Sequence, residues 1–408
     1  KIFITFNWTL WCFTPLLRRL ADYYRGSFDD LGIMLIAPYF VTFICALTFI
    51  AYLPKSYKTG ALSFIFPIAS IVFALFIGLI NNSFLVVIRA FLEWMAPVLF
   101  GFYISTQWRI YPQLSKLTIK IFLWIALSAG LYGIYQYVVA PPWDQYWLLS
   151  VGNVSFGLPE PQGIRVWSTM HSPPPFACIM MTALLLLLTN CSPFSLPAVG
   201  VGFLAFMLSL VRAAWLGWII GLFTMLVSLR PALQVKLLVV LFSMSMLVVP
   251  LSQLDPFGTV ITSRLETFTN IQQDSSYEAR SATYSENLGV AMTEVVGRGL
   301  GSTFFTRPNG EVERIAFDSG ILDIFYTLGW VGSLPYFLGL FILVFSPYKI
   351  PQASSDPFIG ATKGIIAAFL LILGLGPFMT GLSGMAMWSF LGFGTAAKQF
   401  YIFQEQGK

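Results

Sequence analysis

The sequence predicts an all-α polytopic membrane protein with about twelve transmembrane helices and a helical cap formed by a long loop. The composition is the first observation behind this prediction. Of 408 residues, 57% are hydrophobic and 10% are charged, whereas an average soluble domain carries about 25% charged residues. The other two observations are a series of apolar windows of about 20 residues, each long enough to span a bilayer, and two long polar segments that interrupt the series, 141–174 and 251–318.

The apolar windows run from one end of the chain to the other. They lie near residues 1–17, 33–53, 61–80, 84–105, 117–140, 175–190, 196–211, 212–229, 234–250, 320–346, 358–378 and 381–402. Five spans are therefore predicted within 1–140, four within 175–250 and three within 319–408. The division of 196–229 into two spans has alternatives. The lack of an evident internal repeat counts against an inverted-repeat transporter.

Positive charges give the chain a predicted orientation. One set of short loops and adjoining helix ends carries most of the cations: Lys55, Lys58, Arg109, Lys116, Lys120, Arg230, Lys236, Lys349, Lys363, Lys398 and Lys408. Because Lys and Arg concentrate in cytoplasmic loops, this set is predicted to be cytoplasmic and both long loops to face the outside. Arg18, Arg19 and Arg25 of "RRLADYYRG" oppose this orientation. An interfacial amphipathic position of that segment would reconcile them.

The outer loop 251–318 is expected to form a cap containing at least one amphipathic helix. Loops this long without obvious structure are usually functional or disordered. From about Tyr277 the pattern is helical, and it places a set of apolar residues on one face: Leu288, Ala291, Met292, Val295 and Val296. The glycines of "VGRGLGSTFF" are expected to end this helix.

Two arginines lie inside apolar windows. Arg212, in "MLSLVRAAWLGWIIGLF", falls at the predicted outer end of its helix and has no acidic residue close in sequence. Charges in spans tend to face an interior cavity, and the alternative is that Arg212 snorkels to the headgroups. Arg89 precedes Glu93 by one helical turn, so the two side chains share a face. That pair either ties helices together or belongs to an anion site at the depth of Arg212.

The predicted outer loops are rich in arginine, and 251–318 contains no lysine. The arginines are Arg165, Arg264, Arg280, Arg298, Arg307 and Arg314. The planar guanidinium fork suits phosphate oxygens, so these residues above a lipid-facing cavity would suit a lipid-linked diphosphate. The alternative is a solvated loop with ion pairs to Glu266, Asp274, Glu278 and Glu286.

Several other residues are candidates for contact with a substrate. His171 is the only histidine, so a typical His-rich metal site is excluded, and it is either a base or a polar residue at a helix entry. Trp143, Trp147 and Trp167 either anchor at the interface or stack on sugars. Asp318 is either a helix N-cap or a general base.

Motifs for common cofactors are absent from the sequence. GxxxxGK[ST], GxGxxG, HExxH and CxxC do not occur, so no cofactor, no metal and no nucleic-acid partner are expected. The adjacent Asp29 and Asp30 are the alternative, as ligands of a divalent cation.

Four segments within about residues 150–335 resemble motifs of one family. "SLVRAAWLG" resembles the "SRxAWLG" element of O-antigen ligases and Wzy-type polysaccharide polymerases. "DSSYEARSATYSENLGVAMTEVVGRGLGSTFF" resembles that family's outer loop, in which an arginine and a helix precede a Gly-rich turn. "FDSGILDIFYTLGWVG" resembles its helix entry after the loop, and "TMHSPPPFA" is similar to a "GxxxNPNxFA" element. The order of these segments and the predicted number of spans are those of the family.

The resemblance implies a metal-independent GT-C-type membrane glycosyltransferase that uses glycan on undecaprenyl diphosphate. Residue by residue, it implies that Arg212 and Arg280 stabilise the leaving diphosphate, where fixed positive groups help most. Asp318 stands where ligases usually have a histidine, which favours a polymerase with Asp318 as the base. Arg89 and Arg165 would complete the diphosphate site.

The resemblance therefore predicts an O-antigen or exopolysaccharide polymerase in the bacterial inner membrane, with its active site facing the periplasm or outer surface. Donor and acceptor would both be lipid-linked oligosaccharides, with His171, Trp167 and Arg314 near the acceptor or sugar. Chain-length regulator and export proteins would be further partners. Two alternatives stay open: an O-antigen ligase that transfers glycan to lipid A core, and a transporter or flippase of a lipid-linked anionic substrate.

Overall fold

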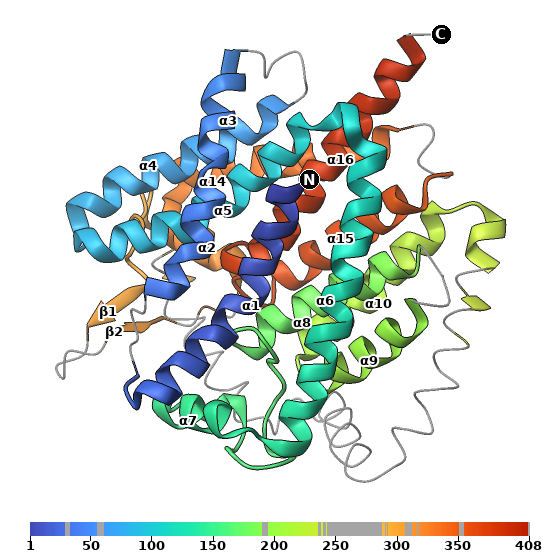
Figure 1. The fold of residues 1–408 in the computed structure, drawn as a ribbon. Helices are drawn as coiled ribbons and strands as arrows, with labels where there is room; N and C mark the ends of the chain where they lie inside the picture. Colours follow the sequence, from blue (N-terminus) through green and yellow to red (C-terminus); the bar gives the residue numbers. More distant parts are fainter. Residues whose placement is uncertain are drawn as a thin grey trace. The chain divides into compact units, whose positions relative to one another are not determined.

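Helices dominate the part of the chain that the structure describes (Figure 1). Within each long apolar run, an α-helix pairs the backbone N–H and C=O groups internally, as a bilayer requires. The structure is a computed structural model. It describes residues 1–28, 33–54, 61–189, 195–235, 238, 239, 242, 288, 289, 291, 293–306, 312–315, 317, 319–350 and 355–406.

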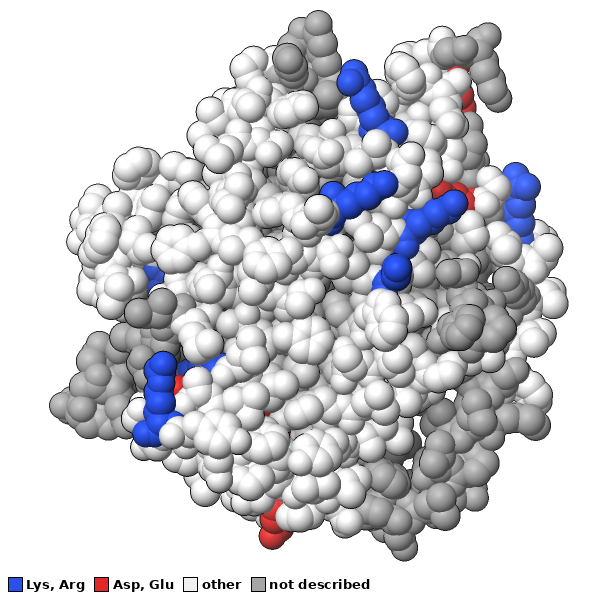
Figure 2. All heavy atoms as spheres, in the orientation of Figure 1, with Lys and Arg blue, Asp and Glu red and all other residues white. Residues whose placement is uncertain are grey.

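Among these described residues, five helical segments are long and apolar enough to cross a membrane. They are Met34–Tyr52, Leu62–Asn81, Phe84–Thr106, Trp108–Val139 and Gly320–Lys349. Four shorter apolar helices are Pro173–Leu187, Ser195–Leu208, Arg212–Ser228 and Pro357–Leu373. The face drawn in Figure 2 is mostly uncharged, with only scattered Lys, Arg, Asp and Glu side chains. The all-helical prediction is confirmed for the described residues apart from one short hairpin, while the number of twelve spans stays a prediction.

The chain divides into two units, and the first comprises residues 1–41, 112–270 and 353–368. Its described helices are α1 (Ile2–Arg25), α7 (Pro142–Val151), α8 (Pro173–Leu187), α9 (Ser195–Leu208) and α10 (Arg212–Ser228). It also contains most of α2 (Ile33–Phe43), of α6 (Tyr111–Val139) and of α15 (Pro357–Leu373). Helix α8 packs between α9 and α10 and is buried along most of its length. Gly221 of α10 and Gly364 of α15 let the two backbones touch, because a Cβ built on Gly364 would lie 2.5 Å from the Gly221 carbonyl oxygen.

The second unit comprises residues 42–111, 271–352 and 369–408. Its described helices include α3 (Cys45–Tyr52), α4 (Ile65–Asn81), α5 (Phe84–Thr106), α14 (Gly320–Val344) and α16 (Gly381–Gln406). Strands β1 (Phe304–Thr306) and β2 (Val312–Arg314) pair antiparallel. Gly101 of α5 lies against α16, and its Cβ would stand 2.4 Å from the Trp388 carbonyl oxygen, so small residues permit the close helix contact.

Helix α1 continues beyond its predicted apolar window and includes most of "RRLADYYRG". Arg18 pairs with Asp22 one turn later at 3.0 Å, and both side chains are 8% exposed. Arg19 is also buried, at 1% exposed. The charges of Arg18 and Arg19, which opposed the predicted orientation, are therefore held inside the unit. The interfacial position of this segment stays a prediction.

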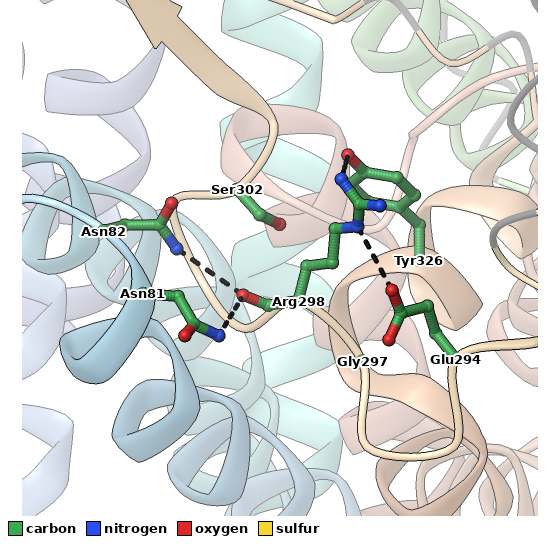
Figure 3. A pocket seen from close by; sticks show the side chains of 7 residues that line it. All are labelled: Asn81, Asn82, Glu294, Gly297, Arg298, Ser302 and Tyr326. Atoms are coloured by element: carbon green, nitrogen blue, oxygen red, sulfur yellow. Dashed lines mark hydrogen bonds and ion pairs between the residues drawn. The ribbon is translucent and has the colours of Figure 1, made fainter.

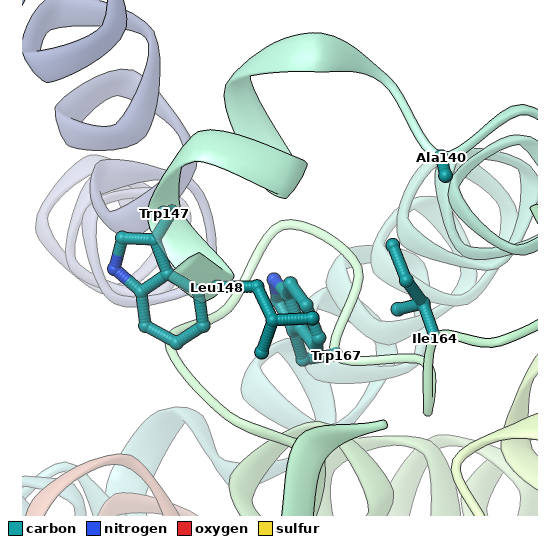
Figure 4. Packing of buried hydrophobic residues seen from close by; sticks show 5 residues of the cluster. All are labelled: Ala140, Trp147, Leu148, Ile164 and Trp167. Atoms are coloured by element: carbon teal, nitrogen blue, oxygen red, sulfur yellow. The ribbon is translucent and has the colours of Figure 1, made fainter. Parts of the chain in front are cut away.

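The sequence predicted that segment 141–174 is an outer loop, but in the structure this segment contains a helix. It contains α7, and its aromatic and aliphatic side chains form a buried cluster around α7 (Figure 4). The cluster members are Ala140, Trp147, Leu148, Ile164 and Trp167. Burial of two tryptophans fixes this segment as part of the first unit's core.

The predicted amphipathic face in the outer loop is only partly formed. Ala291 is 2% exposed and packs with Phe317, Leu322 and Tyr326. Leu288, Val295 and Val296 are exposed, and residues 294–296 are no longer helical. The shared face is therefore wrong for Val295 and Val296, because the backbone leaves the helix before Val295, whereas Leu288 is helical and exposed. Met292 lies outside the described residues.

Candidate functional site

Part of the predicted catalytic site lies outside the described residues. Arg280, Asp318, Arg264 and Arg307 all lie outside the described residues. For Arg314 the backbone is described but the side chain is not. Asp29 and Asp30, the alternative cation ligands, also lie outside. Within the described ranges, no group of three or more His, Cys, Asp and Glu side chains is placed to hold a metal ion.

Arg212 is the first residue of α10, after a tight turn that follows α9. Leu210 in this turn has φ of 55°, and the Ser209 hydroxyl donates to the Phe206 carbonyl oxygen at 2.6 Å. Arg212 is half-buried. A guanidinium at a helix start adds its charge to the partial positive charge of the helix N-terminus, so the two together favour an anion.

Arg165 holds this turn in place. Its guanidinium donates to the carbonyl oxygens of Ser209 at 3.3 Å, Ser155 at 2.7 Å and Leu210 at 3.1 Å. Two of these three acceptors lie just before Arg212. Arg165 was predicted to bind diphosphate, and in the structure its fork positions the start of α10.

Arg89 pairs with Glu93 within α5, as the spacing predicted. Their atoms Nε and Oε1 lie 3.3 Å apart, and the side chains are 41% and 12% exposed. The Arg89 guanidinium also lies 5.4 Å from the ring centre of Phe304 in β1. The contact with Phe304 joins α5 to the hairpin of the second unit. The pair with Glu93 lies within α5, so the alternative that it ties helices together stays a prediction.

His171 and Trp167 flank the entry to α8. His171 is exposed and immediately precedes the N-cap residue Ser172, so it is accessible to a substrate. Trp167 is fully buried, with its ring 5.1 Å from that of Trp147 and 6.1 Å from that of Phe156. The predicted contact between Trp167 and a sugar is therefore wrong in this structure, because other aromatic rings cover its faces.

An ion pair that the sequence did not predict is buried beside this entry. Arg19 Nε lies 2.7 Å from Asp144 Oδ1, and both side chains are almost completely buried. The two terminal nitrogens of Arg19 donate to the carbonyl oxygens of Ser168 and Met170. Arg19 thus connects α1 and α7 to the segment that leads to His171.

The carboxylate of this pair has further partners. Asp144 Oδ2 accepts from the Tyr132 hydroxyl and the Gln136 amide, both at 2.8 Å. The Gln136 carbonyl oxygen accepts in turn from the backbone N–H groups of Trp167 and Ser168. Ser168 has a positive φ of 54°, and this network holds it there. No local sequence signal reveals these contacts, since the partners come from separate segments.

In the second unit, the glycine-rich turn of "VGRGLGSTFF" packs backbone to backbone against two helices. Gly297, Gly299 and Gly301 have φ of 79°, 79° and 89°, which favour glycine. A Cβ on Gly299 would lie 2.2 Å from the backbone nitrogen of Gly78 in α4, and one on Gly297 would lie 2.3 Å from that of Gly329 in α14. Only glycine permits both contacts.

The same turn completes hydrogen bonds that α14 lacks at an internal break. Gly329 has non-helical angles, φ 62° and ψ −176°. The N–H of Arg298 donates to the Tyr326 carbonyl oxygen at 3.1 Å, and that of Gly299 donates to Thr327 at 3.0 Å. Because unsatisfied backbone groups are costly in a membrane, the turn stabilises the broken helix while presenting the Arg298 side chain.

A pocket of about 370 Å³ opens where this turn meets α4 and α14 (Figure 3). It is lined by Asn81, Asn82, Glu294, Gly297, Arg298, Ser302 and Tyr326. The Arg298 side chain lies between the Glu294 carboxylate and the Tyr326 hydroxyl, at 3.5 Å from each. The sequence analysis included Arg298 among the outer arginines but did not single out Asn81, Asn82 or Tyr326. For Asn81 and Asn82, the available signal was a pair of carboxamides at the end of an apolar window.

Comparison of the chain with protein-family models, with curated proteins and with solved structures gives no match.

Proposed function

We propose that this chain is a metal-independent membrane glycosyltransferase that polymerises a polysaccharide. It transfers a glycan from undecaprenyl diphosphate to a sugar hydroxyl of another lipid-linked repeat unit, at the outer face of the bacterial inner membrane. The observation that carries the proposal is the position of Arg212. This residue matches the arginine of the family's "SRxAWLG" element, and it stands at the start of an apolar helix, α10, on a turn braced by Arg165.

The chemistry requires positive charge at the leaving group. The acceptor oxygen forms a bond to the anomeric carbon, and the bond from that carbon to the diphosphate oxygen breaks. Asp318 takes the proton from the attacking hydroxyl, while Arg212 and Arg280 donate to the diphosphate that leaves. Fixed donors aimed at developing negative charge are usually the largest single contribution to such a step, and the N-terminus of α10 adds to the field at Arg212.

The test uses purified protein in lipid nanodiscs with lipid-linked repeat units, and chain length is followed by gel electrophoresis. Removal of a donor to a developing oxyanion usually costs about 100- to 1,000-fold in rate, so Arg212→Ala and Arg280→Ala should each lose at least about 100-fold. Arg212→Lys keeps the charge but loses the bidentate fork, and should retain intermediate activity. Arg109→Ala is the matched control, because Arg109 is exposed and belongs to the predicted cytoplasmic set.

Two outcomes would contradict the proposal. Wild-type rates in both Arg212→Ala and Arg280→Ala would exclude the mechanism. Transfer to lipid A core with no product ladder from lipid-linked repeats would replace the polymerase by a ligase.

A further inference from the structure

We propose that the pocket around Arg298 binds a neutral sugar unit, and that it does not bind the diphosphate. Its biological meaning rests on the proposed function, since the sugar would belong to the lipid-linked glycan. The pocket volume of about 370 Å³ lies within the range of about 300–1,000 Å³ that is usual for small-molecule sites.

The lining offers hydrogen-bond donors and acceptors together. Arg298 supplies only donors, and Glu294, when ionised, only acceptors. Asn81 and Asn82 supply both through their carboxamides, and Ser302 does so through its hydroxyl. A sugar hydroxyl is itself both a donor and an acceptor, so this mixed lining can satisfy each of its hydrogen-bonding groups. A diphosphate would use the donors alone.

The charge of the pocket also favours a neutral ligand. Arg298 and Glu294 lie within ion-pair distance, with Nε and Oε1 3.5 Å apart, so the charges of the lining side chains cancel. A diphosphate placed against Arg298 would also meet the carboxylate of Glu294, and like charges at such distances repel. A neutral polyhydroxyl ligand meets no such penalty.

The lining groups are loosely engaged with one another. The contacts of Arg298 with Glu294 and with the Tyr326 hydroxyl are both 3.5 Å long, as is the contact from the Asn81 amide to the Arg298 carbonyl oxygen. Good N–H···O hydrogen bonds measure about 2.7–3.2 Å. The Arg298 and Glu294 side chains are 46% and 38% exposed. These groups are therefore accessible to a ligand and lose little on binding it.

The backbone beneath the side chains is nevertheless fixed. The glycine turn donates to Tyr326, Thr327 and Ala74 through the N–H groups of Arg298, Gly299 and Leu300. The Arg298 guanidinium lies 5.3 Å from the centre of the Tyr326 ring. A preformed backbone lowers the entropic cost of binding.

The pocket also lies where a lipid-linked sugar would be found. Asn81 is the last residue of the candidate span Leu62–Asn81, and Tyr326 lies in the first turns of the candidate span Gly320–Lys349. Both spans thus contribute a polar end to the pocket. A glycan attached to a membrane lipid emerges at this boundary between apolar and polar surroundings.

The test measures binding directly by saturation-transfer NMR on the full chain in nanodiscs. The probes are the methyl glycosides of glucose, galactose, mannose and N-acetylglucosamine, with inorganic pyrophosphate as competitor. At least one glycoside should bind saturably, and equimolar pyrophosphate should not displace it. Arg298→Met and Asn81→Ala should each weaken that binding by at least about 10-fold, while Arg109→Met, the matched control, leaves it unchanged. Tryptophan fluorescence of each variant checks that the fold is retained.

The inference is overturned by any of three results: no saturable binding of any of the four glycosides, wild-type binding in both folded pocket variants, or displacement by pyrophosphate. Its failure is separable from that of the proposed function. Glycoside binding without polymerisation would contradict only the proposed function, and polymerisation without glycoside binding would contradict only the pocket assignment.

Discussion

Substitution of Gly299 by alanine should destabilise the second unit far more than its size suggests. A methyl group there would lie 2.2 Å from the Gly78 nitrogen and 2.6 Å from its Cα atom, whereas non-bonded carbon atoms normally approach to about 3.5–4.0 Å. The obstacle is backbone, so a side-chain rotation cannot relieve it. Separation of the two backbones would stretch the 2.9 Å bond from Leu300 N–H to the Ala74 carbonyl oxygen.

The magnitude follows from these contributions. A left-handed φ costs a residue with a side chain about 1–2 kcal/mol, and overpacking of a close contact costs about 1–3 kcal/mol. A lost buried hydrogen bond adds about 1–3 kcal/mol. We therefore expect Gly299→Ala to lower the free energy of unfolding by at least about 3 kcal/mol.

Gly152→Ala is the matched control. Gly152, at the end of α7, has φ of 63°, but no atom lies within 4 Å of its built Cβ, so only the backbone strain of about 1–2 kcal/mol applies. The assay is unfolding by SDS in mixed micelles, followed by tryptophan fluorescence. Equal destabilisation of the two variants would refute the backbone contact between the turn and α4.

The remaining predictions concern the first unit and use the same unfolding assay. Asp144→Asn leaves the Arg19 guanidinium buried without its counter-charge, so the free energy of unfolding should fall by about 3–5 kcal/mol. A cost under about 1 kcal/mol would contradict a buried pair. Arg165→Lys keeps the charge, but a single ammonium replaces a guanidinium that reaches three carbonyl oxygens. The free energy of unfolding should therefore fall by about 1–2 kcal/mol and the transfer rate by about 10-fold. Full retention of both would show that Arg165 does not hold the turn before Arg212.

The positions of the helices were largely predictable, because apolar runs of bilayer length fold as helices almost regardless of their surroundings. The division between α9 and α10 was also predicted. Helix α10 begins at Arg212, where the predicted window 212–229 starts. The start of α1 was also found, but its continuation through Arg18 and Arg19 was missed. Charged residues end an apolar window, whereas inside a folded unit they pair with Asp22 and Asp144.

The candidate site was less predictable because it depends on long-range contacts. The helix that "VGRGLG" was predicted to end already stops before Glu294. The packing of this turn against Gly78 and Gly329 depends on segments far away in the sequence. The spacing of Arg89 and Glu93 predicted their pairing, since both lie on one helix. The sequence around Arg165 does not show whether its side chain contacts backbone carbonyl oxygens or phosphate. The same guanidinium fork fits both acceptors.

The break in α14 has a consequence for the order in which the protein assembles. The N–H groups of Gly299 and Leu300 find their acceptors on Thr327 and Ala74, one later and one much earlier in the chain. The turn cannot complete its hydrogen bonds until the segment around Gly329 has been synthesised and has met α4. During biogenesis the bond to Ala74 has both partners available before α14 is synthesised, whereas the bond to Thr327 does not. A nascent chain that ends before α14 lacks one side of this pocket.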